Sequence, residues 1–161
     1  MFRYIGVICI FMFAFYAIFA YERYQKMRLL QGEGFLLLLA FFANELQGCG
    51  RSPADCIRLF QNEAVQKTAF LRAVEKGMAL GEAYASVREG LCLPKGLDEI
   101  LAGTFSDFGR GGRREECSRL SGQIARAEAV VGTERQEQAR RLKLCRTLVT
   151  ASAMGLVILL L

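Results

Sequence analysis

Histidine is absent from this chain of 161 residues, and only two prolines occur. The absence of histidine removes the side chain that most often acts as a general base near neutral pH. No Cys-x-x-Cys pair is present, so the sequence has no paired thiolates or imidazoles of the kind that bind zinc. Strand signals are also scarce, and residues of high helix propensity dominate. The sequence therefore predicts an all-α fold.

Motifs of known catalytic chemistry are missing as well. There is no Gly-x-Ser-x-Gly and no Ser-x-x-Lys sequence to activate a nucleophile. The adjacent acids Asp98–Glu99 and Glu115–Glu116 point to different helix faces, and we expect them to be solvated. We predict neither an enzyme nor a cofactor. A membrane-bound enzyme, which would need a conserved polar cluster, stays an alternative.

Six cysteines are spread along the chain, at Cys9, Cys49, Cys56, Cys92, Cys117 and Cys145. In a cytoplasmic domain, such thiols usually remain free and behave as small buried hydrophobic groups. We expect that behaviour here, with a metal or redox role as the minor alternative.

Two apolar segments occupy the ends of the sequence. Residues 4–21 carry no charge, and neither do residues 147–161. A helix of about 20 apolar residues crosses the ~30 Å hydrocarbon core of a bilayer. We therefore predict transmembrane anchors at 1–21 and 147–161 that flank a helical bundle domain at 22–146. A cleaved signal sequence is the alternative for the first segment, and a buried core helix for the second.

Basic residues beside both segments predict the same orientation. Arg23, Lys26 and Arg28 follow the first segment, whereas Arg3 alone precedes it. The second segment is preceded by Arg140, Arg141, Lys143 and Arg146. Because basic residues favour the cytoplasmic side, both ends place the middle domain in the cytoplasm. These last four residues are also candidates for contacts with lipid head groups.

The charges of the middle region nearly balance. Once Arg3 is set aside, 20 basic groups face 16 acidic ones. The sequence therefore does not predict nucleic-acid binding.

The first part of the middle region contains an unusually apolar helix, predicted over Tyr24–Gln47. Its run from Phe35 to Ala43 is apolar on every side. At 1.5 Å per residue this run spans only about 14 Å, too short for a third membrane crossing. We expect it in the centre of the bundle or against a partner, with a re-entrant segment as the minor alternative.

A second helix is predicted to start after the break at residues 48–51. Ser52 is the expected N-cap, Pro53 the first helical residue, and Asp55 the acid of the first turn. Cys56, Ile57, Phe60 and Ala64 continue at helical spacing. Three more helices are expected at Thr68–Lys76, from Leu80 to near Gly90, and from Pro94 onwards.

A last helix is predicted from Arg113 to Leu161, about 70 Å long, with its second half in the bilayer. Before it lies a turn with three glycines in four residues, Gly109 to Gly112. A flexible surface turn explains this composition. A phosphate-binding loop is the sharper alternative, but the segment lacks Gly-x4-Gly-Lys-Ser/Thr and follows no strand.

Four segments together resemble a known family. GRSPADCIRLF (50–60) resembles a Gly-x-Thr-Pro-Leu-x-Glu-Ala helix start, and GEAYASV (81–87) a second Glu-Ala-aromatic helix. TFSDFGRGGRREECSRL (104–120) resembles a Phe-Gly-x-x-Leu-Gly turn with its following helix, and the tail at 146–161 a short hydrophobic anchor. By the order and spacing of these segments, the chain resembles the stage III sporulation protein AB family.

The resemblance implies a membrane protein of the mother cell, in the channel apparatus around the engulfed forespore. The family is similar to the inner-membrane platform proteins of type II secretion and type IV pilus systems, which bind a cytoplasmic assembly ATPase. By that likeness, we expect a scaffold that docks such an ATPase and contacts other membrane subunits. Self-association stays open.

Exposed polar groups at helix ends are the candidate partner-binding residues, namely Arg51, Asp55, Arg58, Glu82, Arg110, Arg113 and Arg114. The alternative function is a lipid-interacting, membrane-associated helical protein without an ATPase partner. The basic residues beside the C-terminal segment and the apolar run at 35–43 motivate that alternative.

Overall fold

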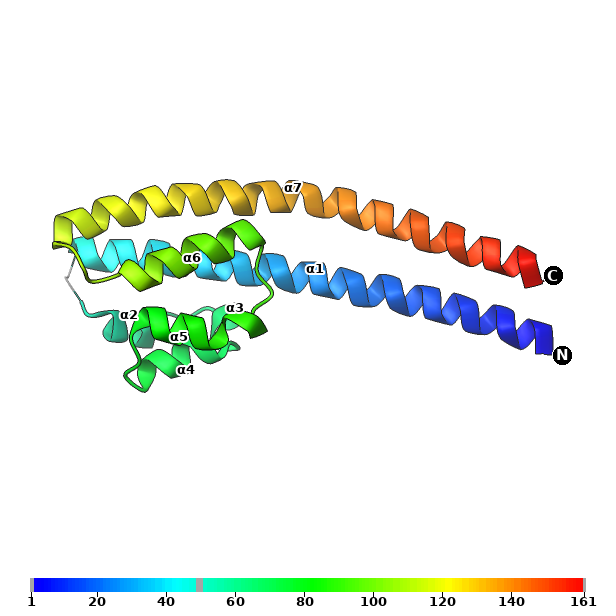
Figure 1. The fold of residues 1–161 in the computed structure, drawn as a ribbon, viewed down its shortest axis with the longest axis horizontal. Helices are drawn as coiled ribbons and strands as arrows, with labels where there is room; N and C mark the ends of the chain where they lie inside the picture. Colours follow the sequence, from blue (N-terminus) through cyan, green and yellow to red (C-terminus); the bar gives the residue numbers. More distant parts are fainter. Residues whose placement is uncertain (1, 49–50, 161) are drawn as a thin grey trace. The chain divides into compact units, whose positions relative to one another are not determined.

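The computed structural model describes residues 2–48 and 51–160 and contains no strand within these ranges. Its elements are α1 (Phe2–Gly48), α2 (Pro53–Leu59), α3 (Glu63–Gln66), α4 (Ala69–Glu75), α5 (Leu80–Val87), the 3-10 helix η1 (Arg88–Gly90), α6 (Lys95–Asp107) and α7 (Arg113–Leu160). The predicted all-α fold is confirmed, with long apolar helices at both ends of the chain (Figure 1).

The chain forms two compact units. Unit 1 combines residues 1–27 of the N-terminal part with residues 135–161, so it contains one part each of α1 and α7. Unit 2 comprises Arg28–Glu134 and holds the rest of these two helices together with α2 to α6.

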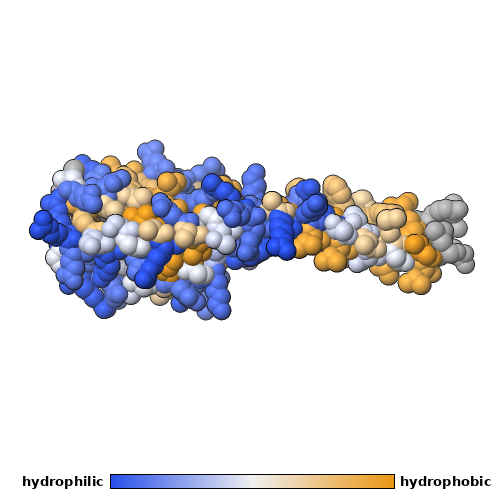
Figure 2. Space-filling model, turned by 90° about the horizontal axis from the view of Figure 1, so that it is seen from above, coloured by the Kyte–Doolittle hydropathy of each residue, from blue (hydrophilic) through white to orange (hydrophobic). Residues whose placement is uncertain are grey.

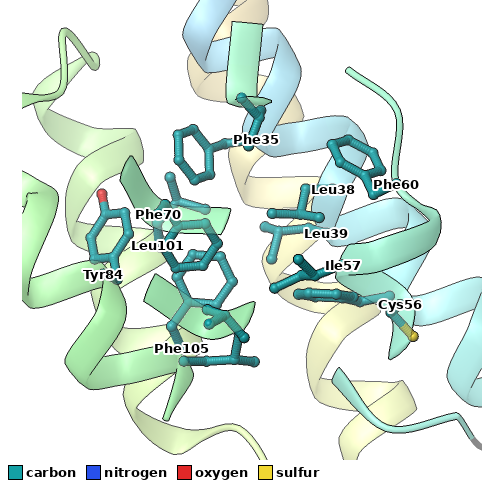
Figure 3. Packing of buried hydrophobic residues seen from close by; sticks show 14 of the residues in the cluster. Phe35, Leu38, Leu39, Cys56, Ile57, Phe60, Phe70, Tyr84, Leu101 and Phe105 are labelled. Atoms are coloured by element: carbon teal, nitrogen blue, oxygen red, sulfur yellow. The ribbon is translucent and has the colours of Figure 1, made fainter. Parts of the chain in front are cut away.

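The apolar run of α1 forms the centre of unit 2. Phe35, Leu38, Leu39 and Phe42 are fully buried, at i, i+3, i+4 and i+7. They pack against residues of the shorter helices, including Ile57 and Phe60 around α2 (Figure 3). The prediction of a bundle centre is confirmed for this stripe. Leu37, on the other side of the helix, is exposed.

Four aromatic rings from four helices form the middle of this core. Phe35, Phe70, Tyr84 and Phe105 come from α1, α4, α5 and α6, and the centroids of the rings in contact lie 5.1 to 6.1 Å apart (Figure 3). Aromatic pairs at this spacing add about 0.5–1.5 kcal/mol each beyond their buried area. Because each ring comes from a different helix, the cluster holds the short helices on α1.

The N-terminus of α2 has the predicted architecture. Ser52 is the N-cap, its Oγ accepts a hydrogen bond from the amide of Asp55, and Pro53 is the first helical residue. The predicted continuation to Ala64 is wrong. The helix ends at Leu59, and Asn62 begins the separate helix α3 by accepting from the amides of Ala64 and Val65.

The remaining helix ends agree with the predicted breaks. Gly77 follows α4 with a φ of +91°, a conformation that favours glycine. Thr68 precedes α4, but its hydroxyl donates to the carbonyl of Val65 and does not cap the helix. The helices expected from Leu80 and from Pro94 are α5, extended by η1, and α6.

In α1, the two helices expected at 4–21 and Tyr24–Gln47 form one continuous helix, because neither glycine nor proline interrupts residues 21–24. The predicted helix from Arg113 is confirmed as α7, which runs to Leu160.

Within unit 2, α2 to α5 lie on one side of α6 (Figure 1).

Unit 1 pairs the apolar ends of α1 and α7. Ala14 of α1 and Ala153 of α7 are buried, whereas Phe15 and Ile158 are 74% and 71% exposed. Both helices are long and apolar enough to cross a membrane, and only 6% of each apolar window is buried. A helix in the core of a soluble protein is mostly buried, so these surfaces are better suited to lipid. Figure 2 shows many hydrophobic residues, coloured orange, on the surface of unit 1.

Candidate functional site

Three of the candidate partner-binding residues line one pocket at the start of α2. Arg51, Asp55 and Arg58 surround it together with Leu59. The side chain of Leu59 is 52% exposed, although it follows two core residues of the same helix. The pocket therefore presents one apolar side chain among two guanidinium groups and a carboxylate.

Local contacts fix two of these charges. The hydroxyl of Ser52 donates to Oδ2 of Asp55 at 2.6 Å, so the cap orients the carboxylate. Arg51 donates from Nη1 to Oε2 of Glu45 at 2.9 Å, which ties the start of α2 to the end of α1. Within the part of the chain that the structure describes, Arg58 has no ion pair and is exposed.

The side of α2 that faces the core is apolar. Cys56 and Ile57 are buried at 1% and 2% exposure. Burial, reinforced by the nearby carboxylate of Glu45, raises the pKa of the Cys56 thiol. The helix that carries the pocket residues is therefore anchored in the core by its buried side chains.

The glycine-rich turn before α7 binds a carboxylate of the chain itself. The amides of Gly109 and Gly111 donate to Oε1 of Glu116 at 2.9 and 3.3 Å. Nη2 of Arg119 donates to both oxygens of Glu116 and to the carbonyl of Asp107. The expectation that Glu116 is solvated is wrong, because its side chain is buried in this network. These amides already have an internal acceptor, so the structure does not favour the phosphate-binding alternative.

The three arginines of this turn have different environments. Arg113 donates from Nε to the carbonyl of Leu46 and from Nη2 to that of Gln47, both at 2.6 Å. It therefore caps the C-terminus of α1, where the last carbonyls of a helix are otherwise unpaired. Arg110 pairs with Asp107 at 3.1 Å, and Arg114 is exposed.

Glu82 lies apart from these groups, exposed in the first turn of α5. It is not among the residues that line the α2 pocket. The preceding Ala79 gives α5 no side-chain cap, so the starts of α2 and α5 differ in chemistry despite their similar sequences.

Tyr84, Arg88 and Asp98 form a polar network that the sequence did not predict. The buried hydroxyl of Tyr84 donates to Oδ1 of Asp98 at 2.7 Å, and Arg88 donates to both carboxylate oxygens at 2.6 to 3.0 Å. Burial opposes ionisation of Asp98, but the hydrogen bonds from Arg88 and Tyr84 outweigh it and lower the pKa. The expectation that Asp98 is merely solvated is wrong; it joins α5 to α6.

The five thiols that the structure describes are free but not uniformly buried. Among the described cysteines, Cys56 is buried, Cys92, Cys117 and Cys145 are partly buried, and Cys9 is exposed on the apolar part of α1. Cys49 lies outside the described residues. The described residues contain no group of three or more histidine, cysteine, aspartate or glutamate side chains that suits a metal ion.

The four candidate lipid-binding residues all lie in unit 1. Arg140 and Lys143 are exposed on α7. Arg141 pairs with Glu137 one turn earlier on the same helix. Arg146 binds Glu22 of α1, with its Nη2 2.5 Å from Oε1.

Comparisons with known proteins identify the family of the chain. No curated protein and no solved structure matches the chain. The sequence model for stage III sporulation protein AB matches residues 3–161, nearly the full length of the chain. The chain therefore belongs to the stage III sporulation protein AB family.

Proposed function

We propose that this chain is a membrane-anchored scaffold of a sporulation channel complex, and that unit 2 docks a cytoplasmic assembly ATPase. Membership of the stage III sporulation protein AB family supports the sporulation role. The likeness of that family to secretion platform proteins supports the ATPase as the partner. Two candidate membrane spans support the anchoring of both chain ends in the mother-cell membrane.

The α2 pocket is the observation that carries the docking proposal. Protein interfaces are commonly built from an apolar or aromatic anchor surrounded by polar groups. Leu59 supplies an exposed apolar contact, while Arg51, Asp55 and Arg58 supply charges of both signs around it. Such a surface fits a protein partner that inserts an apolar side chain and pairs its neighbouring charges.

Binding of the ATPase to full-length protein in detergent tests this proposal. The double variant Arg58→Glu/Leu59→Asp should weaken binding at least tenfold, because it removes the anchor and reverses the charge of an exposed residue. Arg72→Glu, at an exposed position in α4, is the matched charge control and should bind normally. Equal binding by all three proteins would refute docking at the α2 pocket.

The glycine-rich turn is tested separately through Arg110 and Arg114. Arg113 is left unchanged because its substitution would also uncap α1. If Arg110→Glu/Arg114→Glu recovers the ATPase as well as the unaltered chain does, the turn has no part in docking.

The orientation of unit 2 has its own test. Ser121, an exposed residue of α7, is replaced by cysteine. The protein is produced in cells without an engulfed forespore, so that the outer side of its membrane is accessible, and intact cells are treated with a membrane-impermeant maleimide. If unit 2 is cytoplasmic, this cysteine should be labelled only after permeabilisation. Its labelling is the amount by which the variant exceeds the unaltered chain, which carries only the native cysteines. Labelling in intact cells would contradict the predicted topology.

A further inference from the structure

The positive charge of the chain is concentrated in one short part of unit 1. Residues 22–27 and 135–146 hold seven basic residues against Glu22 and Glu137, a net charge of +5. Unit 2 holds 13 basic and 14 acidic residues, a net charge of −1. The basic residues are Arg23, Lys26, Arg135, Arg140, Arg141, Lys143 and Arg146. The whole positive excess therefore lies beside the two apolar segments.

The pairing of Glu22 with Arg146 places these charges at one level of the two helices. That ion pair joins α1 to α7 within unit 1. Lys26 is four residues from Glu22, and Arg140 is six residues from Arg146. At 1.5 Å per residue, this band of charge is about 9 Å deep. Its depth is comparable with the head-group layer on one side of a bilayer.

Four of the basic side chains are available within this band. Arg23 and Lys26 are exposed three residues apart on α1, and Arg140 and Lys143 are exposed three residues apart on α7. Each pair therefore shares a helix face. Among the residues that the structure describes, these four have no carboxylate partner, whereas Arg141 and Arg146 are paired with Glu137 and Glu22. We call Arg23, Lys26, Arg140 and Lys143 the basic collar.

We infer that the basic collar binds the phosphate groups of anionic phospholipids, in preference to zwitterionic lipids. Basic groups between neighbouring membrane helices on the cytoplasmic side are known to hold anionic head groups, at about 1 kcal/mol per residue. Next to the collar, both helices expose large apolar side chains that suit the acyl region, such as Phe15 and Leu148. A nucleic acid would leave that apolar surface uncovered.

The inference requires membrane attachment but no ATPase, so it can fail or succeed independently of the docking proposal. Full-length protein is placed in nanodiscs that contain phosphatidylglycerol and phosphatidylcholine in equal amounts. Lipids that remain on the protein after extraction into detergent are counted by native mass spectrometry. Both faces of a nanodisc have the same lipid composition. The number of retained lipids therefore does not depend on the orientation that a variant adopts in cells.

The unaltered protein should retain phosphatidylglycerol in preference to phosphatidylcholine. In a variant with all four collar residues replaced by glutamine, this enrichment should fall at least tenfold. The control replaces Arg72, Lys76, Lys95 and Arg126, four exposed basic residues of unit 2, and removes the same total charge. That control should keep the enrichment, and raising the salt concentration during extraction should weaken it in the unaltered protein. An unchanged preference in the collar variant, or equal losses in both variants, would overturn the inference.

A second variant gives a change in the opposite direction. Glu22→Gln releases Arg146 from its ion pair and should increase retention of phosphatidylglycerol. Retention that stays the same or decreases contradicts a collar based on charge. Soluble glycerol phosphate is the last comparison: if it displaces the lipid at millimolar concentration, the site recognises free phosphate and the inference is wrong.

Discussion

The hydroxyl of Tyr84 donates a hydrogen bond of 2.7 Å to the carboxylate of Asp98, which lies 14 residues later on another helix. Burial and this hydrogen bond both raise the pKa of Tyr84, from its ordinary value of 10.0. The pKa of Asp98 is shifted the other way, below its ordinary value of 3.8. One contact thus links the stability of unit 2 to pH at both ends of the scale.

Tyr84→Phe should reduce stability by about 1 kcal/mol at neutral pH, the usual net value of one hydrogen bond. A raised tyrosine pKa contributes stability below pH 10.0 that is lost as the pH rises above it. The deficit of the variant should therefore shrink in alkali. Thermal unfolding by circular dichroism, in a non-ionic detergent from pH 7 to 11, checks this. A deficit that grows with pH would contradict it.

Asp98→Asn should reduce stability at neutral pH, and this deficit should shrink as the pH falls. A lowered carboxyl pKa contributes stability above pH 3.8 that is lost as the pH falls through the folded-state value. The unaltered protein should therefore lose stability in acid, and the variant should lose less. Melting temperatures between pH 2 and 7 provide the measurement, with Glu99→Gln, an exposed neighbour, as control.

Arg113→Ala should destabilise the end of α1 by about 1–2 kcal/mol, because two terminal carbonyls lose their charged donor. The adjacent Arg114→Ala removes the same charge without removing a cap and should change stability by less than about 0.5 kcal/mol. Hydrogen exchange followed by mass spectrometry reports on residues 40–48 directly. Equal protection of this segment in both variants would show that the cap contributes nothing.

Glu116→Gln should cost about 1.5–3 kcal/mol, since a buried charged acceptor of two amides and an arginine is replaced by a neutral one. Glu115→Gln is the adjacent exposed control and should be nearly neutral. Unfolding temperature is the readout. A loss of similar size in both variants would mean that overall charge, and not the network in the turn, sets the effect.

Gly34→Ala should destabilise unit 2 by about 1–3 kcal/mol through overpacking. A Cβ atom at this position would lie 2.8 Å from Cγ2 of Val65 and 2.9 Å from Oδ1 of Asn62, which caps α3. Gly122→Ala, in open space on α7, should instead stabilise its helix by up to about 1 kcal/mol. Melting temperatures that rise in both variants would refute the close approach of α1 to α3.

Helices were predicted well where residues close together in the sequence determine the helix start, length or buried face. The cap at Ser52 with Pro53 after it, and the long unbroken stretch from Arg113, both appear as expected. The apolar run at 35–43 also has its expected place in the bundle. In each case a few neighbouring residues determine the conformation through capping, propensity or periodicity.

Contacts between distant residues could not be predicted in this way. Arg113 meets carbonyls 66 and 67 residues earlier, and no pattern around it marks it as a cap. The end of α2 was missed because the apolar spacing continues to Ala64, although Asn62 offers the cap of a new helix. The candidate site contains residues of both groups. Arg51, Asp55 and Arg58 lie at one helix start and line one pocket, as their local spacing predicted. The arginines of the glycine-rich turn have separate roles, because contacts with distant residues determine them.

The contacts of Arg113 also determine where the chain leaves and rejoins its two long helices. Its guanidinium group holds the last turn of α1 against the first residue of α7, so the short helices between them, α2 to α6, lie on a segment whose two ends are close together. In such a topology, a change in the length of this segment does not by itself shift the register of α1 against α7 within unit 2. The exposed residues of the short helices, those of the α2 pocket among them, can thus change while the two long helices that carry them keep their register.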